Sequence, residues 1–203
     1  MDFAWLTGLT IFAFAMAATP GPNNTMVAAS GATYGMARSL PVIAGITFGV
    51  TTIMLVVSAF GASFIVYPAV GVTLKWLGIA YLLWLAWKIA SAEPARGSAD
   101  ATAKGTPLSF LQGALFQFIN PKLWVMVASA VATYGQAAGD AGEIALAIIF
   151  GVIFGTMTFI SVFAWTALGA SVGRFFDSPR AVRVFNGIMA GLLVTSLLPV
   201  VFA

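Results

Sequence analysis

The sequence predicts an all-α integral membrane protein, and three observations support this prediction. Of the 203 residues, 61% are hydrophobic and only 7% are charged, whereas soluble globular proteins usually carry about 25% charged residues. Several apolar runs approach or exceed the roughly 20 residues that a helix needs to cross the hydrocarbon core of a bilayer. These runs are continuous and do not alternate every second residue, which disfavours a transmembrane β-barrel. A soluble protein with so large an apolar core is a poor alternative.

Six apolar segments follow one another along the chain and are the predicted transmembrane helices. They lie at about 3–36, 41–66, 71–89, 108–134, 144–168 and 184–201. The first segment follows Asp2 and no basic residue, so we expect it to remain in the protein and not to be cleaved as a secretory signal. Between the third and fourth segments, residues 91–107 are rich in Ala, Gly, Ser, Pro and charge, which predicts a flexible cytoplasmic linker loop.

The distribution of lysine and arginine predicts the orientation of these segments. If the N-terminus lies outside, seven of the nine basic residues fall on the cytoplasmic side, as the positive-inside rule requires: Arg38, Lys88, Arg96, Lys104, Arg174, Arg180 and Arg183. The outer connections then carry Asp2, Asp140 and Glu143. Lys75 is an exception at the outer end of the third segment, where its side chain is expected to snorkel to the interface. The second exception is Lys122, which lies inside the fourth segment.

An internal repeat divides the chain into two halves. Seven of sixteen positions are identical, without a gap, between PGPNNTMVAASGATYG at 20–35 and NPKLWVMVASAVATYG at 120–135. The alternative is chance similarity between alanine-rich membrane helices, which share small residues for packing. Because three segments separate the copies, the second copy enters the membrane in the opposite direction. We therefore predict two inverted three-helix repeats, at 1–90 and 108–203, joined by the linker at 91–107.

Each copy contains a helix broken by proline, in TPGPNN at 19–24 and in INPKLW at 119–124. A break frees backbone N–H and C=O groups that lipid cannot satisfy, so these groups must face protein or a watery cavity. The positive end of a half-helix favours a carboxylate, and the freed carbonyls at the other end favour an ammonium. Paired breaks in inverted repeats therefore predict a site for a small zwitterion near the bilayer midplane. A purely structural kink, satisfied by neighbouring helices, is the alternative.

The predicted substrate-binding residues surround the two breaks: Pro20, Gly21, Pro22, Asn23, Asn24, Asn120, Pro121 and Lys122. The asparagine amides can bind polar groups without adding charge, although hydrogen bonding between helices explains them equally well. Thr19 and Thr25 can cap the broken ends or bind ligand. Lys122 is the only ionisable residue well inside a segment, which favours a functional role over snorkelling. It can pair with a substrate carboxylate or with half-helix carbonyls.

Small and aromatic residues elsewhere have mainly structural interpretations. Close contacts between helices are predicted at Gly45, Gly49, Gly61, Gly151 and Gly155. Lipid anchoring and packing are predicted for Trp76, Tyr81, Trp84 and Trp87.

Three motifs occur in order along the chain: TPGPNN at 19–24, LKWLGIAYLLWLAWKI at 74–89 and NPK at 120–122. With these motifs the chain resembles, over essentially its whole length, the LysE/RhtB family of bacterial inner-membrane amino-acid exporters. The resemblance implies a six-helix secondary transporter in the inner membrane, driven by the proton motive force. The orientation predicted from lysine and arginine places both termini in the periplasm. TPGPNN and YLLWLAWKIA are most similar to the branch that exports cysteine and O-acetylserine, with homoserine or threonine as further substrates to consider. Transport of another small solute, or a non-transport membrane subunit, is the alternative.

The chain departs from this family at one position. Many members carry an aspartate within the fifth segment, where this chain has Thr158. The usual side-chain proton relay is then missing, so Lys122, water with backbone groups or the ionisation of the substrate must couple protons, or export is facilitated efflux. Without an acidic partner in the membrane, neutral amino acids fit better than basic ones.

Missing residue types exclude several classes of function. The chain has no cysteine and no histidine, which excludes disulfides, thiolate metal sites and thiol redox chemistry. No segment carries the nucleophile, base or metal ligands that an intramembrane enzyme or a metal transporter needs. We therefore expect no enzyme activity, no cofactor and no metal. The expected partners are an amino-acid substrate, the lipid bilayer and protons, without nucleic acid, and a homodimer is left open.

Overall fold

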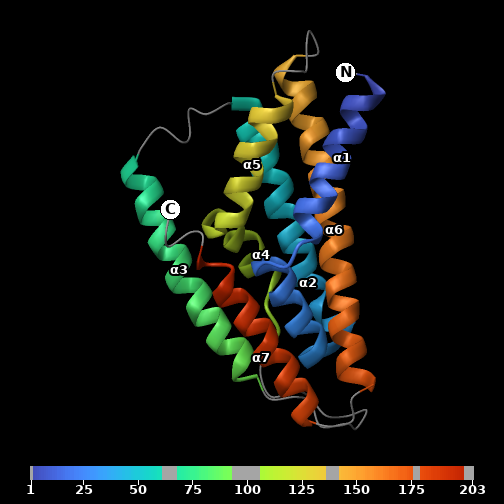
Figure 1. Ribbon diagram of the computed structural model, residues 1–203, viewed down its shortest axis with the longest axis vertical. Coiled ribbons are helices and arrows are strands. Elements are labelled where there is room, and N and C mark those ends of the chain that lie inside the picture. Colours follow the sequence, from blue (N-terminus) through green and yellow to red (C-terminus); the bar gives the residue numbers. More distant parts are fainter. Residues whose placement is uncertain (1, 61–67, 93–105, 136–141, 176–178, 199–203) are drawn as a thin grey trace.

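The computed structural model describes residues 2–60, 68–92, 106–135, 142–175 and 179–198. The elements are α1 (Phe3–Ala18), α2 (Pro22–Phe60), α3 (Pro68–Ala90), α4 (Phe110–Phe116), the 3₁₀ helix η2 (Gln117–Ile119), α5 (Pro121–Tyr134), α6 (Glu143–Phe175) and α7 (Pro179–Thr195). Within the described ranges the chain forms helices and no strand, so the predicted all-α class is confirmed there (Figure 1).

The lengths of the helices fit a membrane protein. By length and composition, α2 and α6 each contain a stretch that can cross a bilayer, and α4 with η2 and α5 can form a third span that is bent by 63°. At 16 residues, α1 is about 24 Å long, less than the roughly 30 Å of hydrocarbon, so it needs the helix that follows it to complete a span.

The first predicted break separates α1 from α2. Thr19 closes α1 in an extended conformation, with φ −61° and ψ 141°, because a residue that precedes proline is disfavoured in the helical region. Pro22 then begins α2, a position at which the missing N–H removes no helical hydrogen bond. The TPGPNN motif therefore interrupts the helix as the sequence predicts.

A second interruption lies inside α2, at Gly35. Its φ of 78° and ψ of 172° belong to a region that is open essentially only to glycine. The residues at 22–34 and 36–60 thus form two helical parts, and the chain reverses direction between them (Figure 1). The second segment was expected to begin at Pro41 but begins earlier, because a proline within the first turns of a helix interrupts only one backbone hydrogen bond.

The break in the fourth segment has its own local causes. Ser109 begins α4 with a capping box, in which its hydroxyl accepts from the Gln112 backbone N–H and the Gln112 side chain accepts from that of Ser109. Asn120 is extended, with φ −81° and ψ 105°, and Pro121 is the first residue of α5. The Asn120 side chain accepts a hydrogen bond of 3.2 Å from the Lys122 backbone N–H, so Asn120 caps α5.

The two parts of α2 form the centre of the molecule and pack mainly on α6 and α4. Four of the five predicted glycine contacts occur at these interfaces: Gly45 against Phe110, Gly49 against Ala114 and Gln117, Gly151 against Leu55, and Gly155 against Thr51. Gly61 lies outside the described residues. The glycines let these helices approach closely, which is how membrane helices associate without a hydrophobic driving force.

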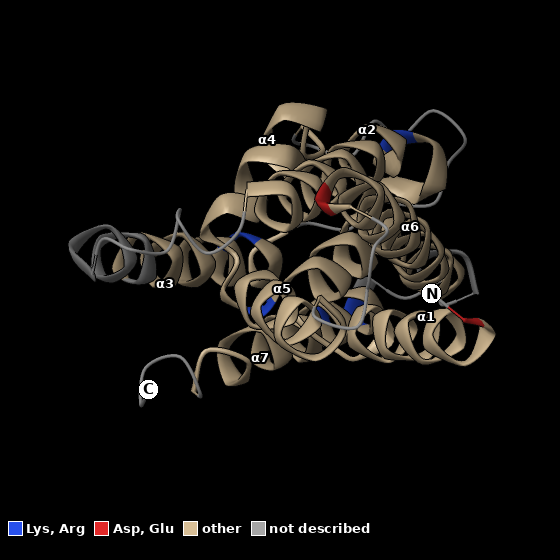
Figure 2. Cartoon of the chain, turned by 90° about the horizontal axis from the view of Figure 1, so that it is seen from above, with Lys and Arg blue, Asp and Glu red and all other residues tan. Residues whose placement is uncertain are grey.

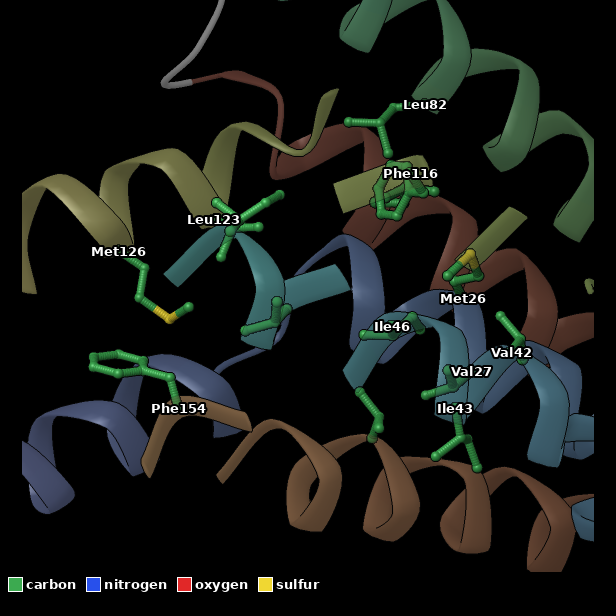
Figure 3. Close-up of a cluster of buried hydrophobic side chains, with 14 of the residues drawn as sticks. Met26, Val27, Val42, Ile43, Ile46, Leu82, Phe116, Leu123, Met126 and Phe154 are labelled. Atoms are coloured by element: carbon green, nitrogen blue, oxygen red, sulfur yellow. The ribbon is translucent and has the colours of Figure 1, made fainter. Parts of the chain in front are cut away.

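The core contains apolar side chains from most of the helices, and Figure 3 shows a cluster of them. The labelled members are Met26, Val27, Val42, Ile43, Ile46, Leu82, Phe116, Leu123, Met126 and Phe154. The outer surface is also apolar, with side chains such as Phe48, Trp87 and Val152 more than half exposed. Trp76 and Trp84 are exposed too, whereas Tyr81 stacks on Phe116 at 5.4 Å. A surface of this kind suits contact with lipid.

The helix directions and the charges follow the long axis of the molecule. In Figure 1, α1 and α5 run in opposite directions. The starts of α1 and α6 lie at one end and carry Asp2 and Glu143, the acidic residues of the described ranges (Figures 1 and 2). The end of α3, with Lys88, and the start of α7, with Arg180 and Arg183, lie at the other end (Figure 1). Arg96, Lys104 and Asp140 fall outside the described residues, as do the side chains of Lys75 and Arg174.

Candidate functional site

The two helix breaks meet at a small, partly open cavity. Its polar lining residues are Asn23, Asn24, Asn120, Lys122, Thr158 and Ser161. Its apolar lining includes Met16, Val50, Leu123, Met126 and Val162. Of the predicted site residues, Gly21 also lines the cavity, while Pro20, Pro22 and Pro121 form the breaks themselves and do not line it. The structure thus brings together two motifs that are about one hundred residues apart in the sequence.

A lysine from the second break reaches the first. The Nζ atom of Lys122, at the start of α5, donates to the backbone carbonyl of Thr19 at 2.7 Å and to its hydroxyl at 2.8 Å. The lysine stem passes directly over Gly21, where an added Cβ would lie 2.8 Å from Lys122 Cδ. Any larger residue at Gly21 would therefore displace the lysine, which explains the glycine between the two prolines.

Paired amides also connect the breaks. Asn23 and Gln117 donate to each other's side-chain oxygens at 3.0 and 2.9 Å. Gln117 is fully buried and also donates to the Gly113 carbonyl at 3.0 Å, while Asn120 donates to the Gln117 oxygen at 3.3 Å. Sequence reasoning missed Gln117, although a glutamine within the apolar run of the fourth segment was the available signal.

The carbonyl end of α1 is satisfied by side chains. Asn24 donates to the carbonyls of Ala17 and Thr19 at 2.7 and 2.9 Å. From α6, the Ser161 hydroxyl lies 2.8 Å from the Ala17 carbonyl, and the Trp165 indole donates to the Ala18 carbonyl at 3.2 Å. Hydrogen bonding between helices, one of the two interpretations of the asparagines, therefore does occur.

Residues of α6 that sequence reasoning did not assign to the site form one wall of it. Ser161 and Trp165 share a helical face with Thr158, and this spacing of three and four residues was the signal available in the sequence. Thr158 is 5% exposed and lines the cavity. Its hydroxyl makes no hydrogen bond with the described residues. In contrast, the Thr25 hydroxyl donates locally to the carbonyls of Gly21 and Pro22, so Thr25 caps the break.

The electrostatic character of the cavity is simple. Lys122 is the one ionisable residue in its lining, which contains no carboxylate. Within the described ranges, no three His, Cys, Asp or Glu side chains come together to hold a metal ion. The site thus offers one cation, neutral amides, hydroxyls and apolar walls.

A second small cavity lies beside the Gly35 kink. Ser30, Thr33 and Tyr34 of α2 line it together with Lys88 of α3. Asn186 of α7 is fully buried and donates to the Thr33 hydroxyl at 3.3 Å. The helical part of α2 at 22–34 therefore connects the two cavities.

The sequence profile of the LysE-type translocators matches residues 14–197. The chain belongs to this family. It is similar to the cysteine/O-acetylserine efflux protein of Escherichia coli (strain K12), with 30% identity over 192 residues that cover 93% of each chain. The protein of that name from Klebsiella pneumoniae is 37% identical over 119 residues, which cover 58% of this chain and 59% of that protein.

The corresponding protein of Salmonella typhimurium is 35% identical over 130 residues, which cover 64% of this chain and 65% of that protein. The match thus spans just under two thirds of the Salmonella protein. No solved structure matches the chain. Membership of the LysE-type translocators confirms the family resemblance found in the motifs, and it makes the chain a membrane translocator and not an enzyme.

Proposed function

We propose that this LysE-type translocator is an inner-membrane exporter of small neutral amino acids or close derivatives, such as cysteine, O-acetylserine, homoserine or threonine. The observation that carries the proposal is the meeting of the two helix breaks at one cavity, where Lys122 contacts Thr19 and Asn23 contacts Gln117. The names of the similar efflux proteins support the cysteine and O-acetylserine branch.

The chemistry of the cavity supports a neutral substrate. A zwitterion carries one carboxylate and one ammonium, which match the Lys122 cation and the acceptors around it. A basic side chain would add a second positive charge near Lys122 with no carboxylate in the lining to offset it. The predicted binding residues, Pro20 to Asn24 and Asn120 to Lys122, are therefore proposed to hold the zwitterion by their amides, the lysine and the backbone of the breaks.

The proposed architecture has six membrane spans, arranged as two inverted three-helix repeats. In this arrangement α1 and the part of α2 at 22–34 form one broken span, and α4, η2 and α5 form the other. The opposite directions of α1 and α5 support the inversion, with repeats at 1–90 and 108–203 (Figure 1). We propose that both termini lie on the periplasmic side, because the positive-inside rule would then place the basic end in the cytoplasm.

Alternating access is the proposed mechanism, in which the two halves rock about the cavity. On the basic side, the backbones of α2 and α6 touch at Gly31 with Thr166 and at Gly169 with Ala28, which leaves no passage between these two helices. Separation of this contact would open the site toward the second cavity, next to Lys88. We propose that the proton motive force drives the cycle, with Lys122, water or the substrate transferring the proton.

The test is transport by purified protein in proteoliposomes. We load labelled cysteine, O-acetylserine, homoserine, threonine and lysine and follow efflux with and without an imposed pH gradient. We expect selective efflux of neutral amino acids, accelerated by the gradient, and loss of most of this activity in Asn120→Ala at equal reconstitution. If correctly inserted wild-type protein moves none of these compounds, the amino-acid function is wrong, and another solute or a non-transport role follows. Equal rates with and without the gradient would instead indicate facilitated efflux.

A further inference from the structure

One acceptor group at the end of α1 is occupied by a cation of the protein itself. The last carbonyls of a helix carry the negative end of its dipole and attract positive charge. The carbonyls of Ala17 and Ala18 accept from neutral side-chain donors, but the Thr19 carbonyl also accepts from the Lys122 ammonium at 2.7 Å. The Thr19 hydroxyl provides a second oxygen at 2.8 Å from the same nitrogen. Thr19 therefore presents two oxygens that hold one primary ammonium.

The cation that occupies this position comes from the other half of the chain. Lys122 is the second residue of α5, so its contact with Thr19 joins the two breaks directly. Its flexible four-carbon stem lies over Gly21. Gly21, Asn120 and Lys122 all line the cavity. A lysine ammonium has three donors, and two of them are directed to Thr19. Chemically, this group is equivalent to the amino group of a free amino acid.

We propose that the carbonyl and hydroxyl of Thr19 form the ammonium subsite of the transport site, and that Lys122 occupies this subsite when no substrate is bound. The ammonium of an arriving zwitterion replaces the lysine on the Thr19 oxygens. The released lysine then pairs with the carboxylate of the same zwitterion. Thr19 is exposed beside the cavity and is not part of its lining, whereas Lys122 lines it. One set of hydrogen bonds replaces another of the same type, so the exchange leaves no charge unpaired.

This exchange makes the contact between the two halves of the protein depend on whether substrate is bound. In the empty protein the Lys122 contact holds α5 to α1, so the halves can move relative to each other only after this contact breaks. Bound substrate removes that contact and frees the halves to move. The inference rests on the proposed function for the identity of the incoming zwitterion, whereas the ammonium subsite itself can be tested without transport.

The experiment is chemical rescue of Lys122→Ala in detergent, read as the midpoint of thermal unfolding. Removal of the lysine leaves the Thr19 oxygens without their ammonium, so we expect a lower midpoint than in the wild type. Ethylammonium fits the vacated position and should raise the midpoint of the variant by about 2–4 °C with saturation. Wild-type protein should shift much less, because its own lysine fills the subsite. Tetramethylammonium, which has no N–H donor, serves as the ionic-strength control.

Lys88→Ala is the matched control variant. It also removes a lysine, from the end of α3, but the Lys88 ammonium lies 5.1 Å above the Trp84 ring. Ethylammonium should therefore not rescue it. If ethylammonium shifts Lys122→Ala, Lys88→Ala and wild type equally, or shifts none of them, Lys122 is only a structural link and the inference is wrong.

A second variant keeps the test decisive if Lys122→Ala does not fold. In Gly21→Ala the added Cβ would lie 2.8 Å from Lys122 Cδ and 3.1 Å from Nζ, so the lysine stem must shift, which weakens its contact with Thr19. Ethylammonium should stabilise this variant as well, and a stable Gly21→Ala protein without that response overturns the inference.

Ligand preference separates this inference from the proposed function. In Lys122→Ala, the affinity for an amine without a carboxylate, such as ethanolamine, should rise about tenfold, while the affinity for O-acetylserine should fall about tenfold. Rescue by ethylammonium in a protein whose wild type moves no amino acid would support the subsite and reject the amino-acid function. Amino-acid efflux by the wild type without rescue of the variants would support the amino-acid function and reject the ammonium subsite.

Discussion

Thr158 is the residue whose chemistry bears most directly on which side chains the cavity accepts. It is buried on α6, lines the cavity and has a hydroxyl without a hydrogen-bond partner among the described residues. It also stands where many members of the LysE/RhtB family carry an aspartate, according to the resemblance found in the sequence. A change of charge at Thr158 should therefore alter selectivity directly.

We expect Thr158→Asp to shift selectivity from neutral toward basic amino acids. The new carboxylate would face the cavity and offset the Lys122 charge, so a cationic side chain would no longer be repelled. Competition between labelled lysine and O-acetylserine in proteoliposomes measures the ratio of their kcat/KM values, which should change about tenfold in favour of lysine. Thr158→Asn has almost the same shape without the charge and should leave this ratio unchanged. An aspartate variant with the wild-type ratio would contradict the assignment of Thr158 to the site.

The candidate site was predictable from the sequence to the extent that local chemistry defines it. Proline pairs, exposed backbone groups and an intramembrane lysine mark the breaks, and the structure brings Asn23, Asn120 and Lys122 to one cavity. Their partners depend on tertiary packing. Asn23 and Gln117 are separated by 94 positions in the sequence, and nothing in it indicates that these two amides meet. Ser161 belongs to the site only because α6 packs beside the end of α1.

At the level of helices, the breaks were easier to predict than the contacts. Proline restricts its own backbone and that of the preceding residue. The ends of α1 and η2 can therefore be predicted from the prolines that follow Thr19 and Asn120. The contact glycines depend on how helices cross. Gly151 and Gly155 were predicted to make close contacts and do so, whereas Gly169, which touches the backbone of Ala28, was not singled out.

We expect Gly169→Ala to weaken the interface between α2 and α6. An added Cβ would collide with the Ala28 carbonyl, which belongs to the backbone and cannot rotate away as a flexible side chain can. The two helices must then separate, which should lower the free energy of unfolding by about 1–3 kcal/mol. Equilibrium unfolding in detergent micelles measures this change.

Gly187→Ala on α7 is the control for that experiment. A Cβ there would have no neighbour within 4 Å among the described residues, and alanine stabilises a helix interior relative to glycine by about 0.5–1 kcal/mol. The two substitutions are chemically identical and should have effects of opposite sign. Equal effects would contradict close packing of α2 on α6.

For the molecule as a whole, the charges at the two ends predict its orientation in the membrane. Glu143 begins α6 at one end, and Arg180 lies in the first turn of α7 at the other (Figure 1). Both side chains are exposed. Because basic residues are retained on the cytoplasmic side, the end with Arg180 should face the cytoplasm and the end with Glu143 the periplasm.

The absence of cysteine from the chain makes this orientation directly measurable, since any labelled thiol must be one that was introduced. We expect a membrane-impermeant maleimide to label Glu143→Cys in intact cells and to label Arg180→Cys only after the inner membrane is permeabilised. The unmodified chain supplies the background, and full labelling of both variants after denaturation controls for expression. The reverse pattern would place the basic end outside. The second cavity would then face the periplasm, and the closed contact between α2 and α6 would block release of the substrate and not its uptake from the cytoplasm.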